Sequence, residues 1–141
     1  MRTLVLFASS LMVLFFLACN EKQDHSPFEF DLDRSFNLGY KNTGHCSCGD
    51  LSITFADVEE GVFPIAGVGG VLEDESRVQL DVMSNDGAQS IELVHRLTMS
   101  TFDRDTVGGY TISLFQVSPY PQGEQTVRKQ DYEIRLMVEE L

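Results

Sequence analysis

The stretch His45-Cys46-Ser47-Cys48-Gly49 carries the most reactive group of side chains in the sequence. Imidazole and thiolate groups bind soft or borderline metals, so His45, Cys46 and Cys48 could hold zinc or copper from one loop. A structural zinc site usually has two separated ligand pairs, which this stretch lacks. The two cysteines could instead form a local disulfide, whose small ring would be strained and easily reduced. Redox chemistry and pairing with another chain are the remaining alternatives.

Elsewhere the sequence does not assemble an acid, a base and a nucleophile. His95 shares its expected strand face with apolar residues, which is typical of a packed core or edge histidine. No serine stands in a nucleophile-elbow context, and the glycines of residues 67–70 do not match a phosphate-binding loop. The acidic clusters 73–75 and 103–105 lack the spacing of a calcium loop. We therefore predict that the protein is not an enzyme.

Residues 62–72 are apolar and glycine-rich, and they join two well-patterned segments. We expect either an exposed partner-binding loop or an irregular strand that covers the core. The residues that would form the binding loop are Phe63, Pro64, Ile65, Val68, Val71 and Leu72. An exposed loop of this kind is also the basis for one alternative function, that of a protease inhibitor.

Apolar residues recur at every second position from Arg34 onward, the pattern of strands with one buried face. The expected strands lie near residues 36–40, 51–58, 78–82, 91–97, 110–114 and 132–138. Pro119 and Pro121 cannot donate to a ladder and should end the strand that starts near Tyr110. The sequence predicts an all-β domain over residues 34–141. We expect an antiparallel β-sandwich of about seven strands, of the immunoglobulin-like or Greek-key type, with a small β-barrel as the alternative.

The amino-terminal segment resembles an export signal. Arg2 is followed by an uncharged apolar run from Leu4 to Ala18, which is shorter than the roughly 20 residues of a spanning helix. Residues 16–19 resemble the bacterial lipobox, so we expect residues 1–18 to be removed and Cys19 to be lipidated. Several acyl chains would give a stable membrane anchor. Residues 19–33 are polar and acidic, and they are interpreted as a tether that could end in a short strand.

The mature chain would be strongly acidic. Loss of Arg2 leaves nine Lys or Arg side chains against 22 Asp or Glu, a net charge of −13 with neutral histidine. A body of this charge repels phosphate backbones and anionic headgroups, which argues against a nucleic-acid partner. The lipid, and not surface charge, would hold the protein to the membrane.

The strand patterns also resemble a family, the small Bacteroidota-type lipoproteins with an all-β domain. Four segments carry the resemblance: Phe36-Asn37-Leu38, Leu51 to Glu60, Gly109 to Pro121 and Tyr132 to Val138. Members commonly have a D-S-R-C-P loop after the second strand, whereas residues 60–65 here contain no cysteine. The group has no assigned activity, so the resemblance implies a fold and an outer-membrane location, facing the periplasm or the cell surface.

Together these observations predict a lipid-anchored envelope lipoprotein. We expect a non-catalytic interaction module of unknown ligand, whose partner is another envelope protein. Binding of zinc or copper through His45, Cys46 and Cys48 is an alternative, as is inhibition of a protease. No cofactor is expected besides the lipid on Cys19, unless a metal binds.

Overall fold

The computed structural model describes residues 28–64, 69, 72–96, 102–119 and 126–141. The strands, in chain order, are β1 (Phe28–Phe30), β2 (Ser35–Gly39), β3 (Thr43–Cys46), β4 (Ser52–Pro64), β5 (Leu72–Ser84), β6 (Gly87–Arg96), β7 (Asp103–Val107), β8 (Tyr110–Ser118) and β9 (Glu133–Glu140). A 3₁₀ turn at Lys129–Asp131 precedes β9. None of the helical segments among these residues is long and apolar enough to cross a bilayer.

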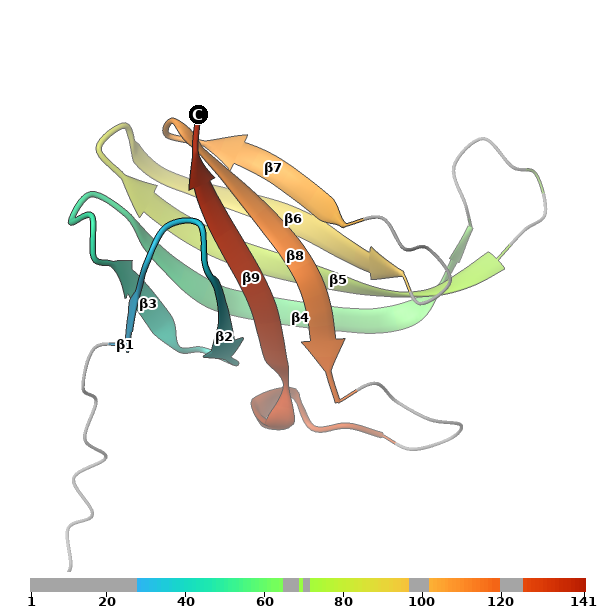
Figure 1. The fold of residues 1–141 in the computed structure, drawn as a ribbon. Helices are drawn as coiled ribbons and strands as arrows, with labels where there is room; N and C mark the ends of the chain where they lie inside the picture. Colours follow the sequence, from blue (N-terminus) through green and yellow to red (C-terminus); the bar gives the residue numbers. More distant parts are fainter. Residues whose placement is uncertain (1–27, 65–68, 70–71, 97–101, 120–125) are drawn as a thin grey trace, which may run out of the picture.

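The described strands form two sheets that pack face to face (Figure 1). Sheet A has the order β1-β3-β4-β5-β6, and sheet B has the order β2-β9-β8-β7. All pairs are antiparallel except β1 with β3, which run parallel. The predicted β-sandwich is confirmed, and the described residues form nine strands where about seven were expected. The sequence pattern missed β3 and β7, whereas β1 is a short strand at the end of the expected tether.

The core lies between the sheets and is built from the alternating apolar positions of both. In sheet A these include Ile53, Phe55, Val78, Leu80, Val82, Ile91 and Leu93, and in sheet B they include Leu38, Ile112, Leu114, Ile134, Leu136 and Val138. Each of these residues is 5% exposed or less. Burial of one such side chain contributes about 1.5–3 kcal/mol, so the shared interior is the main source of stability.

Strand β1 moves the start of the domain toward the amino terminus. Phe30 is 3% exposed and belongs to the core, and Leu32 packs against it. A Cβ on Gly44 of β3 would lie 3.1–3.2 Å from the rings of Phe30 and Phe28, so the glycine allows the rings to sit close to β3. Among the described residues the sandwich therefore includes a strand that lies before the expected boundary at residue 34.

The long hairpin of β4 and β5 revises the interpretation of residues 62–72. Backbone pairing continues to the ends of both strands, where Val62 pairs with Asp74, Phe63 with Glu73 and Pro64 with Leu72. These ends are therefore regular strand, where an irregular or loop structure was expected. Ile65, Val68 and Val71 of the predicted binding loop lie outside the described residues, as do the side chains of Phe63, Pro64 and Leu72.

One contact links the two sheets at the border formed by β6 and β7. The backbone N–H of Val94, in the outermost strand of sheet A, donates to Oδ2 of Asp103 at 2.6 Å. Asp103 is the first residue of β7, the outermost strand of sheet B. Its carboxylate therefore satisfies a backbone amide of the strand at the edge of sheet A.

Candidate functional site

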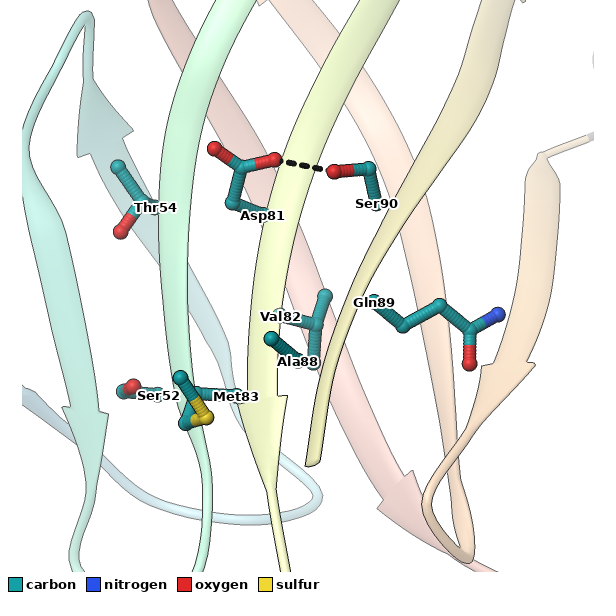
Figure 2. A pocket seen from close by; sticks show the side chains of 8 residues that line it. All are labelled: Ser52, Thr54, Asp81, Val82, Met83, Ala88, Gln89 and Ser90. Carbon is teal, nitrogen blue, oxygen red and sulfur yellow. Dashed lines mark hydrogen bonds between the residues drawn. The ribbon is translucent and has the colours of Figure 1, made fainter. Parts of the chain in front are cut away.

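A shallow groove crosses the outer face of sheet A over β4, β5 and β6 (Figure 2). Its volume is about 490 Å³, compared with about 30 Å³ for each of two smaller hollows. The outward-facing residues that line it are Ser52, Thr54, Asp81, Met83, Ala88 and Ser90. Strand register brings them together in two rows, Thr54-Asp81-Ser90 and Ser52-Met83-Ala88. The surface is hollowed because most of these side chains are short.

The groove combines hydrogen-bonding groups with one apolar side chain. Ser90 donates its hydroxyl to Oδ1 of Asp81 at 2.5 Å, and the hydroxyls of Thr43 and Thr54 are 2.7 Å apart. Met83 is 54% exposed beside them. The Asp81 carboxylate disfavours an anionic ligand, so the groove suits a neutral or cationic one that can exchange hydrogen bonds.

The second site is the turn between β3 and β4. Cys46, the last residue of β3, forms a disulfide with Cys48, and their Cα atoms are 5.0 Å apart. Cys46 is 4% exposed and packs in the core, whereas Cys48 is exposed. Two contacts involve the sulfur atoms: the backbone N–H of Cys48 lies 3.1 Å from Sγ of Cys46, and the Tyr110 hydroxyl lies 3.8 Å from Sγ of Cys48.

Backbone hydrogen bonds hold this turn independently of the disulfide. The N–H of Cys46 donates to the carbonyl of Leu51, the residue before β4, at 2.8 Å. The N–H of Gly49 donates to the carbonyl of Cys46 at 2.9 Å, and Gly49 has φ = 91°, a conformation that suits glycine. The N–H of Ser47 donates to the carbonyl of Phe30, and the Ser47 hydroxyl donates to the carboxylate of Asp31.

The three residues proposed as metal ligands do not converge in this arrangement. His45 is exposed on the outer face of β3, and Cys46 points to the opposite, buried face. The two sulfur atoms are bonded to each other. Over the described part of the chain, no group of three or more His, Cys, Asp or Glu side chains is placed to hold a metal ion.

A polar row on the inner face of sheet A was not expected. Register places Glu60, Ser76 and His95 side by side on β4, β5 and β6. Ser76 is 0% exposed, and its hydroxyl donates to Oε1 of Glu60 at 2.6 Å. Nδ1 of His95 is buried and has no hydrogen-bond partner among the described residues. The alternation of apolar residues thus gives way to polar ones toward this end of the sandwich.

Burial shifts the pKa of Glu60, of His95 and of Tyr132, which interacts with Glu60. It raises the pKa of Glu60, against hydrogen bonds from Ser76 and Tyr132 that lower it. It lowers the pKa of His95. The pKa of Tyr132 rises to about 12, first because of burial and then because of the neighbouring Glu60 charge.

The row contains the residue types of a hydrolase triad but not its geometry. A nucleophilic serine needs a hydrogen bond to its histidine base and access to substrate. Ser76 instead donates to Glu60 and is fully buried. The Ser76 hydroxyl is therefore satisfied by Glu60 inside the sandwich and is not available as a nucleophile.

A carboxylate on the outer face of sheet A is held by two guanidinium groups. Glu75 is 4% exposed, with its Oε1 2.8 Å from Nε of Arg77 and its Oε2 2.9 Å from Nε of Arg96. Both arginine side chains are about one-third exposed. This cluster joins the two strands β5 and β6, which is a structural role.

Cys19, the predicted lipidation site, lies outside the described residues. His95 lies on the inner face of sheet A, where the sequence pattern placed it. The groove residues and the Glu60-Ser76 pair were not identified from the sequence. The alternation of Ser52 and Thr54 with buried Ile53 and Phe55 could have indicated a small-residue outer face.

Comparisons with protein-family models, with curated proteins and with solved structures gave no match to this chain. The resemblance to Bacteroidota-type lipoproteins therefore stays a prediction.

Proposed function

We propose that the chain is a lipid-anchored envelope protein that acts as a non-catalytic binding module. Cys19 carries the anchor, and the outer face of sheet A carries the binding site. The anchor rests on the sequence of residues 1–19. The binding role rests on the groove across β4, β5 and β6.

The groove supports binding because it combines size, exposure and mixed chemistry. Its volume of about 490 Å³ is within the range of ligand sites, and it could take a side chain or a short segment of a partner. Met83 offers apolar contact area, while Asp81 and the flanking hydroxyls can fix the orientation of a partner. By this chemistry the occupant is a neutral or basic surface of another envelope protein.

Catalysis is less well supported, because Ser76 is fully buried and donates its hydroxyl to Glu60 instead of to His95. Metal binding is also less well supported, because His45 lies on the face opposite Cys46. Inhibition of a protease would depend on residues 62–72, and it stays a prediction.

The binding role can be tested by site-specific photo-crosslinking in the native host. A photoreactive residue replaces Ala88, which is exposed in the groove and has a minimal side chain. The matched control places the same residue at Thr106, which is exposed on β7 in the other sheet. We expect a discrete adduct from position 88 that position 106 does not give.

A second substitution establishes that the adduct depends on the groove. Met83→Arg puts a large charged side chain beside Ala88, and it should abolish the adduct while circular dichroism shows an unchanged fold. An adduct that survives this substitution, or that forms equally at both positions, would contradict the proposed binding face.

The anchor is tested separately by intact-mass measurement of protein from the native host. We expect residues 1–18 to be absent and Cys19 to carry acyl chains. Cys19→Ala should move the protein out of the membrane fraction. A bare Cys19 in native protein would refute the anchor without bearing on the groove.

A further inference from the structure

We propose that the Cys46–Cys48 disulfide is a thiol–disulfide exchange site that oxidises thiols of a partner. This activity is separate from binding in the groove and does not depend on it. The inference rests on the unequal exposure of the two sulfur-bearing residues and on the hydrogen bonds of the turn that carries them.

The two cysteines differ in their access to an attacking thiol. Cys48 is exposed in the turn, whereas Cys46 is 4% exposed and packs in the core. Exchange requires attack by a thiolate on one sulfur while the other leaves. Attack is therefore directed to Sγ of Cys48, and Sγ of Cys46 is the leaving atom.

The leaving sulfur has a hydrogen-bond donor already in place. The backbone N–H of Cys48 lies 3.1 Å from Sγ of Cys46 and can stabilise the thiolate as it forms. The Tyr110 hydroxyl lies 3.8 Å from Sγ of Cys48. A disulfide sulfur carries no proton, so the hydroxyl must be the donor in this contact while the disulfide is intact. Both donors favour negative charge on sulfur during exchange.

The turn also keeps the two sulfur atoms close after reduction. The N–H of Gly49 bonds to the carbonyl of Cys46, and the N–H of Cys46 bonds to Leu51. Neither bond involves sulfur, so the two thiols stay close together after reduction. A disulfide that merely stapled distant segments would lose this proximity when reduced.

The reaction balances with two equivalents of a thiol as reductant. A thiolate RS⁻ attacks Sγ of Cys48, the RS–Sγ bond forms, the Cys46–Cys48 bond breaks, and its electron pair goes to Sγ of Cys46. A second thiolate attacks the sulfur of R, RS–SR forms, and Cys48 leaves as thiolate. Two partner thiols are oxidised to one disulfide, and their two protons go to Cys46 and Cys48.

Negative charge near the turn favours some partner thiols over others. Asp31 accepts the hydroxyl of Ser47, and Asp50 lies two residues beyond Cys48. The chain as a whole has a net charge of −12. A neutral or cationic thiol should therefore react faster than an anionic one, and the difference should shrink in high salt.

The test treats the folded full chain with the neutral monothiol 2-mercaptoethanol, followed by quenching with an alkylating agent. Fragmentation mass spectrometry then locates the adduct, which also separates these cysteines from Cys19. We expect the mixed disulfide on Cys48 and the alkyl group on Cys46. An adduct mainly on Cys46, or resistance of the disulfide to the thiol until the chain unfolds, would overturn the proposal.

Two matched variants test the unequal access of the two sulfur atoms without an intact disulfide. Cys46→Ser leaves Cys48 as a free thiol, and Cys48→Ser leaves Cys46. The thiol of Cys48 should be alkylated at least about ten-fold faster than that of Cys46 in folded protein. Equal rates in two variants with native circular dichroism would contradict the assignment of Cys48 as the attacked sulfur.

Discussion

Reduction of the Cys46–Cys48 disulfide should leave the sandwich folded and lower its free energy of unfolding only slightly. A disulfide stabilises mainly by restricting the unfolded chain, and the restriction grows with the length of the closed loop. Because these cysteines are separated by only two positions, the loop is minimal, and the chain-entropy relation gives about 1.6 kcal/mol. This is below the typical contribution of about 2–4 kcal/mol. The turn's backbone hydrogen bonds do not involve sulfur and should persist.

The measurement is urea denaturation of oxidised and phosphine-reduced protein, followed by circular dichroism. With a slope of about 1.5 kcal/mol per molar urea, the midpoint should fall by about 1 M. Cys48→Ser is the control, because its exposed side chain contributes little packing. This variant should match the reduced protein and should not respond to the reductant. Unfolding without urea on reduction, or a loss above about 3 kcal/mol, would refute the reasoning.

Three further predictions concern the core, the outer arginine cluster and pH. Phe55→Ala removes a ring with 0% exposure and should lower the free energy of unfolding, measured by urea titration, by about 3–5 kcal/mol. A loss under about 1 kcal/mol would contradict the core role of Phe55. Glu75→Gln removes the negative charge between Arg77 and Arg96. Because both arginines are partly exposed, the free energy of unfolding should fall by about 1–2 kcal/mol. A urea midpoint equal to that of the wild type would contradict this role. Burial lowers the pKa of His95, so the folded state binds fewer protons, and stability should fall as pH drops below about 6.5. A His95→Gln profile parallel to that of the wild type across this range would disprove the assignment.

The alternation of apolar residues was sufficient to predict the sandwich and most of its interior. Ile53 and Phe55 in β4 and Leu80 and Val82 in β5 occupy the buried positions that the period of two assigned to them. Each strand carries this information locally, because successive side chains point to opposite faces. Pro119 also marked the end of β8 at Ser118.

The missed strands lack that local signal. In β3 the inward positions are Gly44 and Cys46, so one of the two has no side chain to reveal a buried face. In β7 only Val107 is a buried apolar residue. These segments are strands because neighbouring strands pair with them, which is information from distant parts of the chain.

The groove and the inner polar row depend on register between strands. Thr54, Asp81 and Ser90 come from three strands, and only the alignment of two hairpins places them in one row. Glu60 and Ser76 occupy inward positions, but polar residues in a sequence pattern indicate solvent. The hydrogen bond that lets Ser76 be buried depends on the register of β4 and β5, which no single strand encodes.

The bond between Asp103 and Val94 bears on self-association of the protein. An outermost strand such as β6 offers unpaired backbone groups, which can template the addition of a strand from another molecule and start a fibril. Oδ2 of Asp103 occupies one such amide at 2.6 Å and places a negative charge where an incoming carbonyl would have to bind. A strand that adds at this part of the border would first have to break that bond, so the Asp103 side chain opposes strand addition at Val94.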